Sequence, residues 1–184
     1  MRLRFSRQDW IALGLRELAK QGPPGLTIDA LCAAAARTRG SFYHHFEGHD
    51  DFIDAMMRTW KQRDTDAIIQ TVDNVAQNKT ALLNDKASRI NHRLEGRIRQ
   101  LAQQNKVAAR WLKIVDAARI AFLEMLHETS SGVSRDDSKT LAKLDYAALV
   151  GAQTLWPNAS ATTMAGLGAS FSELIKAKYG GSHD

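Results

Sequence analysis

Apolar residues recur at intervals of three and four along most of this 184-residue chain, and they alternate at every second position in no sustained stretch. Phe52, Ile53, Met56, Met57 and Trp60 form one such series. A period of 3.6 residues places these side chains on one face of an α-helix, whereas a half-buried strand requires a period of two. The sequence therefore predicts an all-α fold without a sheet.

Helix caps and helix breakers divide the first fifty residues into three short helices. Ser6, Thr27 and Thr38 are suitable N-caps, and a Gly-Pro-Pro-Gly turn separates the first helix from the second. The three helices are expected at about 7–21, 28–35 and 39–45. A unit of this size is too small to be stable alone, so it must pack against the residues that follow.

The remainder of the chain shows longer helical patterns, separated by polar or proline-containing breaks. Six helices are expected there, at about 50–74, 82–101, 107–112, 114–128, 137–155 and 160–179. The chain thus has about nine helices in all. We expect two domains: a small three-helix domain at residues 1–48 and a larger helical domain at residues 49–184.

Composition excludes several classes of protein. No run of some 18 apolar residues is present, and no apolar stretch follows the basic start of the chain, so neither a membrane span nor a signal peptide is expected. The only cysteine is Cys32, which excludes an intramolecular disulfide framework and a cysteine-based zinc cluster. We therefore expect a cytoplasmic protein.

The net charge of +5 is concentrated at the N-terminus. Residues 1–46 contain seven basic and three acidic residues, a balance of +4, and the rest of the chain carries +1. This asymmetry indicates that the N-terminal part contacts a polyanion. A random excess of cations on a solvated face is the alternative interpretation.

The segment 26–56 predicts a helix, a sharp turn and a second helix with small and polar residues at its start. Such a helix can enter the major groove, which is about 12 Å wide, because Gly40 and Ser41 keep the backbone close to DNA. Arg39 can pair with guanine O6 and N7 or with a phosphate, and Tyr43 and His44 offer donors to the DNA backbone.

Nine consecutive residues, Thr38-Arg39-Gly40-Ser41-Phe42-Tyr43-His44-His45-Phe46, resemble the recognition helix of TetR-family repressors. Thr27-Ile28-Asp29-Ala30-Leu31 upstream and Asp50-Asp51-Phe52-Ile53 downstream match the same pattern at the right spacing. The close resemblance covers about residues 10–57. It implies an N-terminal helix-turn-helix domain that binds operator DNA and a C-terminal domain for effector binding and dimerisation.

The resemblance also implies the DNA contacts. Thr27 would meet a phosphate, and Thr38, Arg39 and Ser41 would face bases. Tyr43 and His44 would meet the sugar-phosphate backbone. Phe42, His45 and Phe46 would pack inward, which makes His45 a structural residue.

Three positions depart from the family pattern. Ala36 stands where the turn usually has a glycine, and a left-handed alanine costs roughly 1–2 kcal/mol, so the turn is either strained or differently shaped. Arg37 replaces an apolar turn residue, which either loosens the packing or directs a further cation towards DNA. His49 replaces a lysine that meets a phosphate, and it can supply that charge only when protonated.

Two further sites are predicted, of which the effector pocket is implied by the resemblance. An effector pocket for an unknown small molecule is predicted to involve Met57, Trp60, Trp111, Phe122 and Met125, although each would equally suit a helical core. A homodimer interface is predicted on the last two helices, where small and apolar residues alternate at helical spacing. Its candidates are Ala148, Gly151, Leu155, Met164, Gly168 and Phe171, and closure of the monomer core is the alternative.

The sequence gives little support for a metal site or for catalysis. His45 and His49 have a metal-ligand spacing, but Glu47-Gly48 breaks the helix between them, and no catalytic motif or phosphate loop is present. We expect no enzyme activity, no cofactor and no metal. The sequence predicts a DNA-binding transcriptional regulator, a repressor that a small molecule releases. The alternative is a helical ligand-binding or dimerisation protein with a degenerate DNA-binding head.

Overall fold

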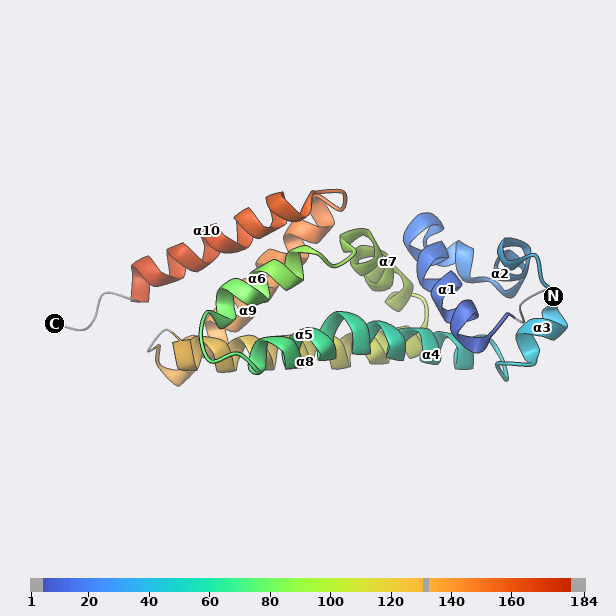
Figure 1. The fold of residues 1–184 in the computed structure, drawn as a ribbon, viewed down its shortest axis with the longest axis horizontal. Helices are drawn as coiled ribbons and strands as arrows, with labels where there is room; N and C mark the ends of the chain where they lie inside the picture. The colour runs from blue at the N-terminus through green and yellow to red at the C-terminus, as the bar shows by residue number, and fades with distance from the viewer. Residues whose placement is uncertain (1–4, 131–132, 180–184) are drawn as a thin grey trace. The chain divides into compact units, whose positions relative to one another are not determined.

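The computed structural model describes residues 5–130 and 133–179, and every regular element in these residues is a helix (Figure 1). This confirms the all-α prediction. The elements are a 3-10 turn η1 (Pro23–Leu26), a π-helical turn η2 (Gln62–Asp66), α1 (Arg7–Gln21), α2 (Ile28–Ala35), α3 (Arg39–Tyr43), α4 (His49–Lys61), α5 (Ala67–Asp73), α6 (Lys79–Ser88), α7 (His92–Ala102), α8 (Lys106–Ser130), α9 (Arg135–Leu155) and α10 (Ala161–Tyr179). Because α4 and α5 are continuous through η2, the described residues form nine separate α-helical segments. None of the described helices is both long and apolar enough to cross a membrane.

The number of helices agrees with the prediction, but the middle of the chain is divided differently. Residues 82–101, expected as one helix, belong to α6 and α7. The Ser88 hydroxyl donates to the Asp85 carbonyl at 2.8 Å, and the His92 ring lies 3.0 Å from the Ser88 carbonyl, so side chains occupy carbonyls that a continuous helix would use. Conversely, residues 107–128 hold no glycine or proline, and α8 runs through both helices predicted there.

Contacts divide the chain into two compact units. The first consists of the residues through Gln62 together with Arg93–Ile114, and the second consists of Arg63–His92 and the residues from Val115 onward. The continuous helix α4–η2–α5 and the long helix α8 therefore contribute residues to both units. The functional boundary predicted at residues 48 and 49 remains a prediction.

An aromatic cluster forms the core of the first unit. The Phe42 ring of α3 lies 5.4 Å from the Trp10 ring of α1 and 5.5 Å from the Phe52 ring of α4, and Phe46 packs beside it. All four side chains are at most 2% exposed. A Cβ atom at Gly14 would meet the Phe52 ring at 2.5 Å, so this glycine allows α1 and α4 to approach.

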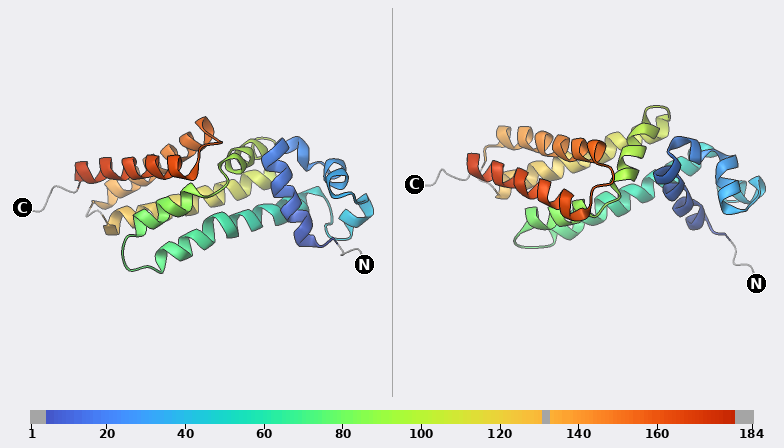
Figure 2. Two further views of the ribbon diagram at one scale, coloured as in Figure 1. Left: turned by 45° about the horizontal axis from the view of Figure 1, so that its top comes forward. Right: turned by 90° about the horizontal axis from the view of Figure 1, so that it is seen from above.

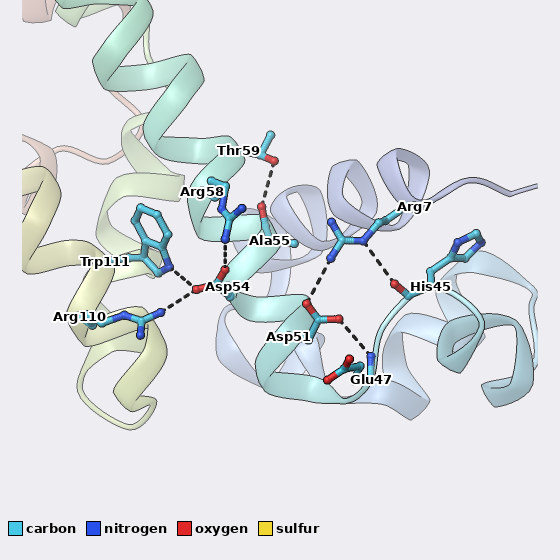
Figure 3. A network of polar contacts seen from close by, with 10 residues as sticks. All are labelled: Arg7, His45, Glu47, Asp51, Asp54, Ala55, Arg58, Thr59, Arg110 and Trp111. Atoms are coloured by element: carbon cyan, nitrogen blue, oxygen red, sulfur yellow. Dashed lines mark hydrogen bonds and ion pairs between the residues drawn. The ribbon is translucent and has the colours of Figure 1, made fainter.

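Asp54 links α4 to α8 within the first unit (Figure 3). Its carboxylate accepts hydrogen bonds from Trp111 Nε1 at 2.8 Å, Arg110 Nη2 at 2.7 Å and Arg58 Nη2 at 2.7 Å. Partial burial alone would raise the pKa of Asp54, but the hydrogen bonds from Trp111 and Arg58 outweigh it and hold the pKa below its usual range.

In the second unit α10 packs along α6 and also contacts α9 (Figure 2). A Cβ at Gly168 would lie 3.1 Å from the Asn84 side chain, so this glycine allows α10 to come close to α6. Val72, Phe122 and Leu126 form one buried cluster in this unit. A second cluster consists of Val133, Leu141 and Ile175, with Phe171 and Tyr179 packed against it.

We predict that Asp54→Ala lowers the free energy of unfolding by about 1–3 kcal/mol, because the indole N–H of Trp111 loses its acceptor. Urea denaturation at pH 7 measures this change. Asp73→Ala is a matched control, since its carboxylate pairs with Lys79 at 2.8 Å on the surface, and such exposed pairs contribute less than about 1 kcal/mol. If the two substitutions lowered the free energy of unfolding equally, the stabilising role assigned to the Asp54 hydrogen bonds would be contradicted.

The same contacts of Asp54 predict that the free energy of unfolding depends on pH. Because the pKa of Asp54 is lowered in the folded state, its contribution to stability is complete above the unfolded pKa, about 3.9, and disappears as pH falls through the folded value. The stability difference between the wild type and Asp54→Ala should therefore shrink on acidification. A difference that stays constant down to acid unfolding would show that the charge of Asp54 is unimportant.

Candidate nucleic-acid interface and effector cavity

Two threonine caps begin the two helices of the candidate interface, and both caps agree with the sequence prediction. Thr27 Oγ1 accepts from the Ala30 N–H at 3.2 Å at the start of α2, and Thr38 Oγ1 accepts from the Ser41 N–H at 3.3 Å at the start of α3. The turn between them contains Ala36 in the left-handed conformation, with φ 49° and ψ 48°. The sequence left this turn either strained or differently shaped, and the structure shows the strained, left-handed alanine.

The helix α3 ends at Tyr43, two residues earlier than predicted, and it presents polar side chains outward. Phe42 is the one buried side chain of this helix, and it is fully enclosed. Of the residues predicted to contact DNA, five are exposed and Ser41 is half-buried; the exposed ones are Thr27, Thr38, Arg39, Tyr43 and His44. The start of α3 is therefore accessible to a large ligand.

The other two predicted contacts, Arg37 and His49, are half-buried and already engaged. The Arg37 guanidinium lies 5.4 Å from the Phe5 ring centroid and donates to the Ala36 carbonyl at 3.1 Å. The His49 Nε2 lies 2.9 Å from the Leu26 carbonyl, which ties the start of α4 to η1. A phosphate contact by His49 would consequently have to use Nδ1.

Residues for which the sequence predicted no individual role hold the turn after α3. Arg7 of α1 donates to the His45 carbonyl at 3.3 Å and to Asp51 of α4 at 3.2 Å (Figure 3). Asp51 also accepts from the Glu47 N–H at 3.1 Å. The His45 ring lies 3.0 Å from the Phe5 carbonyl, in agreement with the structural role predicted for it.

Arg39 forms an ion pair with Asp29 that was not predicted from the sequence. Its Nε and Nη2 atoms each donate to one carboxylate oxygen of Asp29 on α2, both at 2.6 Å. The hydrogen bonds from Arg39 hold the pKa of the Asp29 carboxyl below its usual range. Ten residues and a turn separate the two positions, so no helical spacing indicates the pair.

A cavity of about 120 Å³ lies within the second unit. Its wall is mainly apolar, with side chains from α5, α6, α8, α9 and α10, including Ile68, Leu83, Ala87, Phe122, Leu149 and Met164. Arg119 at its edge donates to Thr65 Oγ1 at 3.0 Å and to the Asp64 carbonyl at 3.1 Å. Asp145 and Tyr146 also contribute to the lining.

Of the five predicted effector-pocket residues, only Phe122 lines this cavity. Met57 and Trp60 are fully buried in the first unit, and Trp111 is bonded to Asp54. Met125 packs against the Val72, Phe122 and Leu126 cluster. Methionine and tryptophan fill a helical core as well as they line a pocket, which is why their residue type did not locate the cavity.

The predicted dimer residues also separate into two groups. Four of the six line the cavity of the second unit, namely Ala148, Met164, Gly168 and Phe171. Leu155 is 69% exposed, and a Cβ at Gly151 would meet nothing within 4 Å. Further exposed leucines lie on the same two helices: Leu144 on α9, and Leu167 and Leu174 on α10.

A capped helix, a left-handed turn and a second capped helix with an exposed polar face define a helix-turn-helix DNA-binding protein. Residues 11–56 match the family model of bacterial regulatory proteins, tetR family. The N-terminal part of the chain is therefore similar to the DNA-binding domain of TetR-family regulators. The comparison with curated proteins gives no match.

Solved structures of regulators share the fold along nearly the whole chain. A transcriptional regulator from Rhodococcus sp. Rha1 has a TM-score of 0.79 at 14% identity, over 94% of this chain and 97% of that one. The fatty acid degradation regulator FadR from Bacillus halodurans has a TM-score of 0.74 at 15% identity, over 96% of each chain. FadR from Bacillus subtilis in complex with stearoyl-CoA has a TM-score of 0.69 at 14% identity, over 97% and 100%.

We predict that Ala36→Gly raises the free energy of unfolding by about 1 kcal/mol, because glycine adopts the left-handed conformation of this turn without a steric cost. Ala33→Gly in the exposed part of α2 is the control and should instead destabilise by about 1 kcal/mol. Urea denaturation of both variants measures the two changes. An Ala36→Gly protein no more stable than the wild type would refute the strain.

Proposed function

We propose that this regulator represses transcription by occupying a near-palindromic operator as a homodimer, and that a small apolar molecule releases it. The observation that carries the DNA-binding part is the exposed start of α3, held by its buried Phe42 within a TetR-family domain. The start of such a helix offers backbone N–H groups and short side chains to the major groove.

The proposed DNA contacts differ in kind. Thr38, Arg39 and Ser41 face bases, because they occupy the first turn of α3. Thr27 is the exposed N-cap of α2 and contacts a phosphate. Tyr43 and His44 contact the sugar-phosphate backbone. Arg37 adds positive charge at the edge of the surface, and His49 does so only when it is protonated.

The substitution Gly40→Glu tests DNA binding directly. A Cβ at Gly40 would meet only the Thr38 hydroxyl, at 3.7 Å, so the fold tolerates the side chain, while its charge would face the phosphates. We expect the wild type to select a near-palindrome from a random duplex pool and to bind it about 10³-fold or more tightly than random DNA. Gly40→Glu should lose this binding, as measured by fluorescence anisotropy at fixed salt.

Gly96→Glu is the matched control, since a Cβ at Gly96 meets nothing within 4 Å and α7 carries no proposed DNA contact. It should bind the selected duplex like the wild type. Failure of the wild type to select any sequence would favour the alternative, a ligand-binding protein with a degenerate DNA-binding head.

A second copy of this chain is the proposed partner of α9 and α10. Leu144 and Leu155 of α9 are 54% and 69% exposed, and Leu174 of α10 is 70% exposed. Residues 144, 148, 151 and 155 follow one another at helical spacing, so they share one face of α9. An apolar face of this kind is covered in a symmetric dimer by the same face of the partner.

Leu174→Glu should therefore produce monomers in light scattering and weaken operator binding, because it places two like charges in a symmetric apolar contact. Leu174 is a better position for this test than Phe171, which packs against the Val133, Leu141 and Ile175 cluster and would disturb the fold. Ile114→Glu is the control, since Ile114 is 42% exposed on α8. A dimeric Leu174→Glu protein would exclude this face as the interface.

The proposed effector site is the cavity of the second unit. Its volume, about 120 Å³, is close to that of an engineered cavity of about 150 Å³ that binds benzene. Asp64 and Asp145 in the lining carry negative charge against the single guanidinium of Arg119. Asp64 pairs with Arg63 at 2.6 Å, and Asp145 lies 3.2 Å from His127. This balance favours an uncharged ligand about the size of one substituted ring.

Toluene, p-cresol and 4-methylbenzoate are matched probes for this site. The two uncharged compounds should raise the melting temperature, by an amount equivalent to about 2.7 kcal/mol at 100 times Kd, and should lower the affinity for the selected duplex. The benzoate should do so less, because a further carboxylate would lie near Asp64 and Asp145.

Filling the cavity should remove the effect of the probes. Ala87→Phe places a ring into the lining, whereas Ala81→Phe places one on the exposed side of the same helix, α6. Stabilisation by p-cresol should be lost in the first variant and kept in the second. Equal stabilisation of both variants would mean that the compound binds elsewhere.

A further inference from the structure

We propose that Asp29 is a positioning residue that directs Arg39 at a guanine, so that the two side chains together specify one G·C pair in each half of the operator. The proposal rests on the proposed DNA binding and goes beyond it, because it assigns the recognition of a base to a pair of residues from two helices.

The geometry of the ion pair carries this inference. Asp29 lies in the first turn of α2 and Arg39 is the first residue of α3, so the pair crosses the turn of the helix-turn-helix unit. The carboxylate accepts from Nε and from Nη2, at 2.6 Å each. Two parallel hydrogen bonds of this kind fix the plane of the guanidinium as well as its position.

The edge of the guanidinium that Asp29 leaves unused is the one suited to guanine. An arginine has five N–H donors, and Asp29 takes one on Nε and one on Nη2. The remaining donor of Nη2 and a donor of Nη1 form a second edge with two parallel N–H groups. Guanine alone presents two neighbouring acceptors, O6 and N7, in the major groove, whereas adenine presents a donor beside N7.

A purely stabilising role explains the pair poorly. Both side chains are largely exposed, at 65% for Arg39 and 69% for Asp29, and exposed ion pairs add little to stability. A carboxylate on a DNA-binding surface also repels phosphates, which reduces affinity for every sequence. The Asp29 carboxylate therefore lowers the affinity for all DNA and fixes the orientation of Arg39. Both effects are expected of a residue that increases sequence specificity.

In vitro selection from a random duplex pool tests the proposal with the wild type, Arg39→Ala and Asp29→Ala. The wild type should select a motif with one position per half-site at which guanine is preferred. Arg39→Ala should lose the preference at that position alone, by about 5- to 150-fold. Asp29→Ala should reduce the guanine-over-adenine ratio there by about threefold or more, because the guanidinium is no longer fixed, while its binding to non-specific DNA stays equal or increases.

Two variants separate positioning from folding. Asp29→Asn keeps one acceptor oxygen and should give an intermediate guanine preference. Asp50→Ala removes an exposed first-turn acid of α4 and should leave the preference unchanged. Thermal melts of all variants show whether the fold is kept, as the exposure of Asp29 leads us to expect.

The outcomes distinguish this proposal from the proposed function. If the wild type selects no sequence, DNA recognition itself fails. If the wild type selects a motif but Arg39→Ala keeps the preference for guanine at every position, Arg39 does not contact a guanine and the inference is overturned. If Asp29→Ala and Asp29→Asn both keep the full guanine preference, Arg39 acts without Asp29, and the positioning role is overturned.

Discussion

The packing of Phe42 is the interaction on which the rest of the candidate DNA-binding surface depends. The helix α3 has only five residues, and an isolated helix of that length is not stable in water. Its one fully buried side chain, Phe42, lies against Trp10 of α1 and Phe52 of α4. Because this ring is enclosed by two longer helices, the exposed residues of α3 keep defined positions. The hydrogen bonds of Arg7 to the His45 carbonyl and to Asp51 fix the turn that follows.

Features set by neighbouring residues could be predicted from the sequence. The caps at Thr27 and Thr38 depend on residues within about three positions, and the structure has both of them. For the turn at Ala36 the sequence left two shapes open, and the structure has the left-handed one. Pairs between distant residues could not be predicted. Asp29 and Arg39 are ten residues apart, and the cavity collects side chains from five helices. The break between α6 and α7 was also missed, because it depends on hydrogen bonds of Ser88 and His92 rather than on glycine or proline.

In the second unit, the same two helices contribute to both proposed sites. On α10, Met164 and Phe171 line the cavity, while Leu174 is exposed on the same helix. On α9, Leu149 lines the cavity and Leu155 is exposed. A ligand that displaces these helices would therefore also change the faces proposed to meet in the dimer. In the proposed dimer, this arrangement would let effector binding change the spacing of the two DNA-binding domains, because that spacing would depend on the dimer contact.

We propose that the start of α3, held by Phe42, is the surface that meets DNA. Amide hydrogen exchange, measured with and without the selected duplex, tests it most directly because it locates contacts without any substitution. We expect added protection at residues 27–29 and 38–44, and unchanged exchange in α9 and α10. Added protection elsewhere in the chain, with none at residues 38–44, would contradict it.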